Sequence, residues 1–215
     1  MSGVRLRTAV LGASGGIGRR VVERLLAHGH AVACQSRSAE KLARWQGKAD
    51  LHAFDPADAT RMTGFIAGAD AVVFALGVHT LQATTVFSDA TAALIAAMRH
   101  NGARRLVALT GIGAGDSRGH GGWLYDRIIF PLVTRRMYDD KDRQEALIAD
   151  SDLDWTIVRP APFSAKPPEG PLQVHTGIPP GLQLSRIHRD EVAGFIVSEL
   201  EAPRHLHQRV FIGHP

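Results

Sequence analysis

The stretch that decides the fold is Thr8-Ala-Val-Leu-Gly-Ala-Ser-Gly-Gly-Ile-Gly-Arg-Arg20, near the start of the chain. A first strand is expected at Arg7–Leu11, with Ala9–Leu11 as its apolar part, and apolar residues recur at helical spacing from Val21 to Leu26. Between them lie the glycines Gly12, Gly15, Gly16 and Gly18. Glycine permits a tight turn and a close approach of a pyrophosphate to the backbone, and the next helix N-terminus favours an anion. This order of strand, glycine turn and helix indicates a dinucleotide-binding unit.

The glycine spacing itself leaves two alternatives open. The pattern reads G-x-x-G-x-x-G through Gly15, or G-x-x-x-G-x-G through Gly16. Neither is the G-x-G-x-x-G of the commonest dehydrogenases, because Ser14 occupies the second glycine position. A glycine cluster also suits a plain strand–helix turn that binds nothing. Agreement among strand, turn and helix favours the binding turn.

Composition excludes several classes of protein. The chain has 215 residues, 25 Lys and Arg against 21 Asp and Glu, and a net charge of +4. Because the cations are scattered, we expect no nucleic-acid partner. We expect no membrane partner, because no apolar run of membrane-spanning length is present. We also expect no secretory leader, because the N-terminal residues show no apolar leader region with a cleavage site. A single cysteine, Cys34, suits a cytoplasmic protein without disulfides, and His205 and His207 alone predict no metal site.

Beyond the first unit, apolar segments alternate with amphipathic ones. Further strands are expected at Ala31–Gln35, Leu51–Phe54, Ala69–Ala75, Arg105–Thr110, Trp155–Val158 and Val210–Ile212. Helices are expected at Gly16–His28, at Ala39–Gln46 with Ser38 as N-cap, from Pro56, and at Thr85–Arg99, Thr134–Asp150 and Arg189–Leu200. Gly102 lies just past the end of the helix at Thr85–Arg99. The proline-rich segment Ala161–Gly181 is expected to hold no regular element.

This alternation predicts an α/β fold: a Rossmann-like, doubly wound parallel sheet in a three-layer α/β/α arrangement. We expect one domain over residues 1–215, with a small substrate-side segment at about 160–190. Ligands of such sheets bind at the carboxyl ends of the strands.

The residues after the second strand favour one cofactor. An acidic residue there suits the ribose of NAD, whereas arginine suits the 2′-phosphate of NADP. Here Arg37 stands between Ser36 and Ser38, and no carboxylate precedes Glu40. We therefore expect NADP(H) to be preferred over NAD(H), and the alternative is that Arg37 is a solvated turn residue.

Several motifs resemble one known family. They are Leu-Gly-Ala-Ser-Gly-Gly-Ile-Gly at 11–18, Asp55, Ala-Leu-Gly at 75–77, Asp140-Lys141 with Glu145, and Ser151-Asp-Leu-Asp-Trp-Thr-Ile-Val-Arg-Pro160. From Thr8 to about Ile212 the chain resembles an atypical short-chain dehydrogenase/reductase of the single-domain NAD(P)H-binding type. That type includes the flavin reductase also called biliverdin reductase B and the NmrA-like and HSCARG-like proteins.

The resemblance implies a role for each matching position. The pyrophosphate would be held by Gly12, Ala13, Ser14, Gly15, Gly16 and Ile17, and the 2′-phosphate by Arg37. Asp55 and Pro56 would border the adenine, and Ala75, Leu76 and Gly77 the ribose. Thr110, Pro160, Ala161, Pro162 and Phe163 would flank the nicotinamide, with Lys141 near its ribose.

The catalytic residues are less well defined. The Tyr-x-x-x-Lys of typical short-chain dehydrogenases is absent, since Tyr138 lies three residues before Lys141. This pair still shares a helix face and is a candidate proton relay, or Tyr138 is a half-buried helix residue and Lys141 a partner of Glu145. Thr110 stands at the usual serine position and would donate to a substrate carbonyl or bond the cofactor amide.

Two functions remain open at this point. One is an NADPH-dependent reductase that passes hydride to a small conjugated acceptor such as a flavin or quinone, with an aromatic platform formed by Trp123, Tyr125, Phe130 and Phe163. The other is a non-catalytic NADP(H)-binding redox sensor of the NmrA-like type, which acts through a protein partner. The missing Tyr-x-x-x-Lys favours the sensor. Because conjugated acceptors need no strong base, the same absence argues against an alcohol dehydrogenase. The oligomeric state stays undetermined.

Overall fold

A computed structural model describes residues 5–77, 84–114, 135–166, 170–179 and 181–215, and within them the side chains of 135–137 are left out. Its strands are β1 (Arg7–Leu11), β2 (Ala31–Ser36), β3 (Asp50–Ala53), β4 (Ala71–Phe74), β5 (Arg105–Leu109), β6 (Asp154–Pro160), β7 (Gln173–His175) and β8 (Gln208–Gly213). Its helices are α1 (Gly18–Ala27), α2 (Ala59–Ile66), α3 (Val86–Asn101), α4 (Arg135–Ala149) and α5 (Arg189–Glu201), with a 3₁₀ helix, η1, at Glu40–Trp45.

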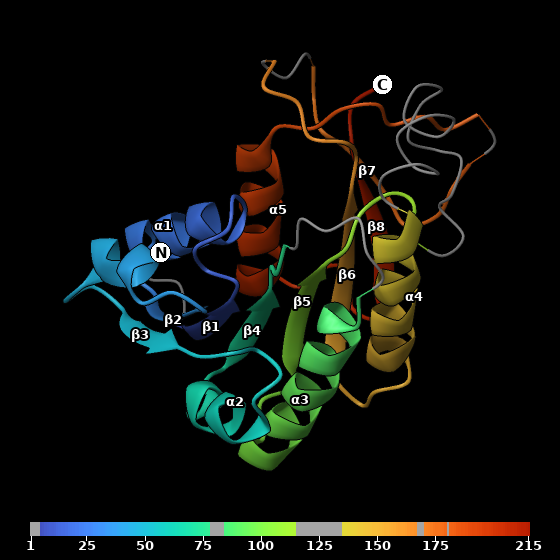
Figure 1. Cartoon of the computed structure of the whole chain (residues 1–215). Helices are drawn as coiled ribbons and strands as arrows, with labels where there is room; N and C mark the ends of the chain where they lie inside the picture. Colours follow the sequence, from blue (N-terminus) through green and yellow to red (C-terminus); the bar gives the residue numbers. More distant parts are fainter. Residues whose placement is uncertain (1–4, 78–83, 115–134, 167–169, 180) are drawn as a thin grey trace.

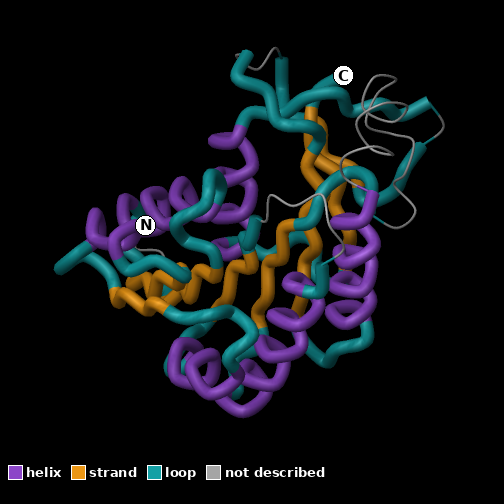
Figure 2. Tube along the Cα trace, in the orientation of Figure 1, coloured by secondary structure: helices purple, strands orange, loops and turns teal. Residues whose placement is uncertain are grey.

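The described strands form one sheet in the order β3-β2-β1-β4-β5-β6-β8-β7. All neighbours are parallel except β7 and β8. Figure 1 shows α1 and α5 on one face and α2, α3 and α4 on the other, and Figure 2 shows the strands as the middle layer. The doubly wound, three-layer α/β prediction is confirmed.

Two apolar cores fill the space between the sheet and these helices. One lies under α1, α5 and η1 and contains Val21, Leu25 and Ile196, and the other lies under α2, α3 and α4. Strands β1, β4 and β5 lie inside the sheet and are almost entirely buried, which explains why their sequences are mostly apolar. None of the described helices is both long and apolar enough to cross a membrane.

Several helix ends differ from the sequence prediction. The segment after Ser38 forms a 3₁₀ helix, and the Ser38 hydroxyl donates to the Glu40 carboxylate at 3.0 Å instead of capping the backbone. Pro56 does not begin α2, because Asp58 caps that helix by accepting from the Arg61 amide at 3.0 Å. In contrast, α3 ends at Gly102, which adopts the left-handed conformation that glycine commonly takes after a helix.

The sequence prediction missed strand β7 and made strand β6 too short. The proline-rich segment Ala161–Gly181 contains β7, which pairs antiparallel with β8 at the edge of the sheet, so the prediction of no regular element was wrong. Strand β6 continues through Arg159 and Pro160 because these residues pair with Phe211 and Ile212 of β8.

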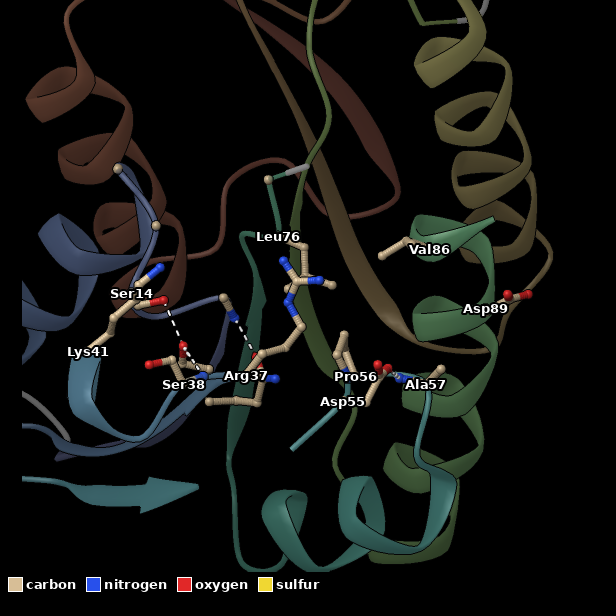
Figure 3. Close-up of a pocket in the computed structure, with 16 residues that line it drawn as sticks. Ser14, Arg37, Ser38, Lys41, Asp55, Pro56, Ala57, Leu76, Val86 and Asp89 are labelled. Carbon is tan, nitrogen blue, oxygen red and sulfur yellow. Dashed lines mark hydrogen bonds between the residues drawn. The ribbon is translucent and has the colours of Figure 1, made fainter. Parts of the chain in front are cut away.

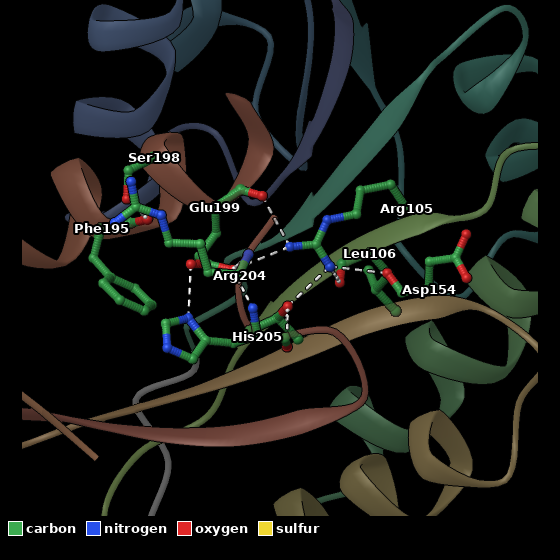
Figure 4. Close-up of polar contacts among 9 residues, drawn as sticks. Arg105, Leu106, Asp154, Phe195, Ser198, Glu199, Arg204 and His205 are labelled. Carbon is green, nitrogen blue, oxygen red and sulfur yellow. Dashed lines mark hydrogen bonds and ion pairs between the residues drawn. The ribbon is translucent and has the colours of Figure 1, made fainter. Parts of the chain in front are cut away.

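A polar cluster links α5 to the end of the sheet at which β5 and β6 begin (Figure 4). Arg105 of β5 donates to the Glu199 carbonyl oxygen of α5 at 2.9 Å and to the Thr156 hydroxyl at 2.9 Å. The buried Glu199 carboxylate bonds the Nδ1 of His205 at 2.8 Å. Because this cluster lies at the opposite edge from the strands' carboxyl ends, it stabilises the fold without entering the ligand edge.

Candidate functional site

Two positions in the turn between β1 and α1 have room for glycine only. Gly12 has a φ of +81°, and a Cβ on it would lie 2.7 Å from the Ala75 carbonyl oxygen of the strand next to β1. A Cβ on Gly18 would lie 2.2 Å from the Gly12 carbonyl oxygen. The N-cap of α1, Ile17, makes no side-chain capping bond, so the first helix amides face the turn without such a partner. These features fit a turn that receives an anion.

A cavity of about 770 Å³ lies against this turn (Figure 3). Its lining comes from the carboxyl ends of β1, β2, β3 and β4 and from the start of α3. The lining residues are Gly12, Ser14, Gly15, Gly16, Gln35, Ser36, Arg37, Ser38, Lys41, Asp55, Pro56, Ala57, Leu76, Gly77, Val86 and Asp89. This position at the carboxyl ends of parallel strands is where doubly wound sheets bind ligands.

Hydroxyl groups and cations gather at the β2 end of the cavity. The hydroxyls of Ser14 and Ser36 lie 2.8 Å apart, and the Ser38 amide donates to the Ser36 hydroxyl at 3.2 Å. Figure 3 shows the Arg37 side chain directed into the cavity, and Lys41 also lines it. This corner therefore presents positive charge and hydroxyl groups to a ligand.

Gln35 is a site residue that sequence reasoning missed. It is buried, its side-chain oxygen accepts from the Gly12 amide at 3.0 Å, and its amide nitrogen donates to the Phe54 carbonyl at 2.7 Å. It thereby links the glycine turn to the end of β3. A lone amide side chain inside an otherwise apolar strand was the available signal, because a buried polar group needs partners.

The three predicted catalytic residues meet at the end of β5. The Lys141 amino group donates to the Thr110 carbonyl oxygen, and the Thr110 hydroxyl donates to Glu145 at 2.8 Å. The Tyr138 hydroxyl oxygen lies 2.6 Å from the position that a Cβ on Gly111 would take. Lys141 is also 5.3 Å from the centre of the Phe87 ring. The structure therefore brings Thr110, Tyr138 and Lys141 together, outside the lining of the cavity.

The Thr110 contact limits what this residue does. Its hydroxyl proton points to a carboxylate, so toward a ligand the oxygen offers lone pairs. Donation to a substrate carbonyl would require breaking a bond to a charged acceptor, which is among the stronger kinds. This geometry disfavours the donor alternative and suits an oxygen that accepts from an amide.

Glu145 is the centre of a buried charged cluster that anchors this end of the sheet. Its carboxylate binds Arg159 of β6 at 2.5 Å and 3.0 Å and Arg209 of β8 at 3.1 Å. Arg159 and Glu145 are only 1% and 3% exposed. Sequence reasoning considered Glu145 only as a partner of Lys141 and missed these bonds. The available signal was Arg159, because a charged residue in a mostly apolar strand needs a buried partner of opposite charge.

Asp140, the neighbour of Lys141 on α4, binds the first turn of α3. This fully buried carboxylate accepts from the Phe87 amide at 2.9 Å and from the Ser88 hydroxyl at 2.6 Å, in the first turn of α3. A carboxylate at a helix N-terminus is favoured by the exposed amides there. The Asp140-Lys141 pair therefore joins α4 to both α3 and β5.

Residues 12–203 match the NAD(P)H-binding family. The chain belongs to this family. The match begins at the glycine turn, and it extends past both the cavity and the Lys141 cluster.

Solved structures share the fold of this NAD(P)H-binding protein. A short-chain dehydrogenase/reductase from Veillonella parvula in complex with NADP has a TM-score of 0.80 and 16% identity, over 99% of this chain and 96% of that one. ChuY, an anaerobillin reductase from Escherichia coli O157:H7, has a TM-score of 0.79 and 22% identity, over 97% of both chains.

Uncharacterized proteins of Mycobacterium tuberculosis and Mycobacterium bovis are 31% identical over 154 residues, 72% of this chain. The aligned part is only 14% of those relatives' length.

The remaining predicted site residues that the structure describes lie outside the cavity lining. Ala13, Ile17 and Ala75 are buried behind the glycine turn, outside the lining. Pro160 and Ala161 are buried at the end of β6, Pro162 is partly buried, and Phe163 is 43% exposed. Trp123, Tyr125 and Phe130 of the proposed aromatic platform lie outside the described residues.

A histidine group absent from the sequence predictions joins the ends of α1 and α5. His28 and His30 both bond the Glu201 carboxylate, at 2.7 Å and 2.9 Å, and the three ligating atoms lie within 4.8 Å of one another. The Nδ1 of His30 accepts from the Leu6 amide at 3.2 Å, so its Nε2 carries the proton directed at Glu201. A metal at Nε2 would displace that proton, so this group acts as a hydrogen-bonded link.

Lys141 makes protein stability depend on pH in a defined direction. Burial lowers the pKa of its amino group to about 8, against the opposing effect of Glu145. The unfolded chain, with a pKa near 10.4, binds more protons between these values, so stability from this residue rises from about pH 8 to 10.5. Relative to Lys141→Met, we expect the wild-type free energy of unfolding to gain about 3 kcal/mol over that range.

Urea unfolding of both proteins between pH 7 and 10.5 measures this difference. Cys34, whose thiol pKa burial raises to about 12, acts in the opposite direction, but it is common to both proteins and cancels. A difference between the two proteins that stays constant across this range would contradict the buried, titrating amino group.

Proposed function

We propose that this protein is an oxidoreductase that uses NADPH to reduce a small conjugated acceptor such as a flavin or quinone. The observation that carries the proposal is the cavity bounded by the glycine turn on one side and Arg37 on the other. Membership of the NAD(P)H-binding family supports the cofactor class, and the likeness to an anaerobillin reductase supports a conjugated acceptor.

The residues around the cavity fit the NADP(H) cofactor. A Cβ at Gly12 or Gly18 would overlap backbone atoms, so only glycine at these positions permits this turn, and the α1 amides beside it suit a diphosphate. The Arg37 guanidinium offers a planar fork for the 2′-phosphate, with the Ser36 and Ser38 hydroxyls beside it. Asp55 and Pro56 lie across the cavity and would border the adenine, with Leu76 and Gly77 on the ribose side.

At the nicotinamide end, Thr110 and Lys141 would orient the ring. Thr110 would accept from the carboxamide through its hydroxyl oxygen, because its proton already binds Glu145. Lys141, held on the Thr110 carbonyl, would direct its ammonium group toward the ribose hydroxyls. Pro160, Ala161, Pro162 and Phe163 would form the wall beyond them. Bound NADPH supplies the hydride.

Proton supply distinguishes this proposal from alcohol oxidation. A conjugated acceptor that has received a hydride forms a stabilised anion and takes its proton from water, so no strong general base is needed. The Tyr138 hydroxyl beside Gly111 and the Lys141 ammonium remain the candidate local proton donors.

Replacing Arg37 with alanine tests the cofactor preference. We expect the dissociation constant for NADPH to rise about tenfold or more, and that for NADH to change less than about twofold, because only NADPH carries the 2′-phosphate. Calorimetric titration of both coenzymes gives both values. Lys48→Ala, an exposed cation outside the cavity lining, is the matched control. Equal losses for the two coenzymes would contradict the assigned role of Arg37.

Turnover separates the reductase from the alternative sensor. The absent Tyr-x-x-x-Lys supports an NADP(H)-binding sensor of the NmrA-like type. Purified protein with NADPH and either FMN or a naphthoquinone should lose absorbance at the reduced-nicotinamide band if it is a reductase. Tight NADPH binding with no oxidation across a panel of flavins, quinones and bilins would favour the sensor.

A further inference from the structure

An arginine outside the predicted site lies across the glycine turn. Arg189, the first residue of α5, has its Nε and Cδ at 3.4 Å and 3.5 Å from the position that a Cβ on Gly16 would take. Its guanidinium carbon lies 4.7 Å from the centre of the Phe163 ring. Phe163 follows β6 and is 43% exposed. The Arg189 side chain therefore extends between the glycine turn and the segment after β6.

The start of α5 is fixed to the glycine turn by a second arginine. Arg20 of α1 donates to the Asp190 carboxylate at 3.0 Å and to the Gly16 carbonyl oxygen at 2.8 Å. The α5 N-terminus also has a capping box between His188 and Glu191. These contacts hold the Arg189 backbone beside Gly16, so the position of its side chain does not depend on a flexible loop.

The acids nearest to Arg189 are engaged elsewhere. Asp190 pairs with Arg20 and lies 3.2 Å from His188. Glu191 accepts from the His188 amide at 3.0 Å and contacts His214 at 2.8 Å. Among the described residues, Arg189 has the Phe163 ring as its partner and no carboxylate. A guanidinium stacked on an aromatic ring keeps its edge donors free for an anion.

We propose that Arg189 binds the diphosphate of the bound dinucleotide and closes over the glycine turn from the α5 side. The inference rests on the proposed cofactor. Gly16 lines the cavity, and the Arg189 stem lies within van der Waals distance of the position that a Cβ on Gly16 would take, so the stem lies directly against the turn. The α1 N-terminus then contacts the diphosphate from one side and the Arg189 fork from the other, with the charge-assisted bonds that arginine forms to phosphate.

The test compares two ligands that differ in the diphosphate. NADPH carries it, whereas adenosine 2′-monophosphate has the adenine, ribose and 2′-phosphate without it. For Arg189→Ala we expect NADPH to bind about tenfold more weakly by calorimetry, and adenosine 2′-monophosphate to change less than about twofold. Arg189→Lys keeps the charge but loses the planar fork, so its loss should be intermediate.

Arg24→Ala is the matched control. Arg24 is an exposed arginine on the same helix pair, next to Gly194 of α5, and its removal should leave both affinities unchanged. Thermal unfolding of each variant checks that α5 remains docked.

Two results would overturn the inference: wild-type NADPH affinity in Arg189→Ala, and an equal loss of affinity for both ligands. Both leave the proposed cofactor intact, provided that the wild-type protein binds NADPH. If the wild-type protein binds no coenzyme, the proposed function fails, and this inference fails with it.

Discussion

Gly18→Ala is expected to abolish NADPH binding and to lower the free energy of unfolding by about 3 kcal/mol or more. The added Cβ would lie 2.2 Å from the Gly12 carbonyl oxygen and 3.0 Å from the Ala13 Cα. Both are backbone atoms of the turn, so no side-chain rotation relieves the overlap. The turn must open or α1 must move away, and either change disrupts the site at which the turn would bind the diphosphate. Urea unfolding and calorimetric titration with NADPH measure the two effects.

Gly64→Ala is the natural control for Gly18→Ala. Gly64 lies in α2, is exposed, and has nothing within 4 Å of an added Cβ. Alanine should therefore raise stability by roughly 0.5–1 kcal/mol through helix propensity and leave coenzyme binding unchanged. If Gly18→Ala behaved like Gly64→Ala, the steric account of the turn would be wrong.

Glu145→Ala is expected to lower the free energy of unfolding by about 3–5 kcal/mol, because it removes one partner of a buried ion pair. Arg159 would keep its charge at 1% exposure without the carboxylate that now lies 2.5 Å away. Thr110 would also lose the acceptor of its hydroxyl proton. We therefore expect weaker coenzyme binding as well as lower stability, both measurable on the purified variant.

A double variant distinguishes the effect of removing one partner of the buried ion pair from the effect of removing the whole pair. Glu145→Met combined with Arg159→Met replaces the pair with apolar side chains and should destabilise less than Glu145→Ala alone. Glu23→Ala removes an exposed partner that lies 3.9 Å from Arg19 and should cost less than about 1 kcal/mol. Strictly additive single effects would argue against the buried pair as a unit.

Local patterns were sufficient for most of the architecture. The bounds of β1 agree with the structure at both ends, because a continuous apolar run followed by glycine has few alternative conformations. The end of α3 at Gly102 was equally clear, since a positive φ favours glycine. The first helix was predicted two residues early, because Gly16 and Ile17 belong to the turn. Arg37, Asp55 and Leu76 follow strands in the sequence, and all three line the cavity.

Local sequence patterns could not predict the contacts between segments that are far apart in the chain. Strand β7 exists because β8 offers an edge, and three residues carry too little periodicity to predict it. The role of Gln35 depends on the Gly12 amide, and that of Glu145 on two arginines of different strands. The stacking of Arg189 on Phe163 likewise joins segments that only the folded chain brings together.

The amino-acid sequence by itself determined the α/β architecture and the glycine turn, because both follow from local backbone freedom and the burial period of neighbouring residues. The tertiary structure alone decided which charges pair and therefore which way a hydroxyl proton points, as at Thr110 and Glu145. The physical reason is that a buried polar group takes its partner from whichever element packs against it, and that choice is made across the sheet rather than along the chain.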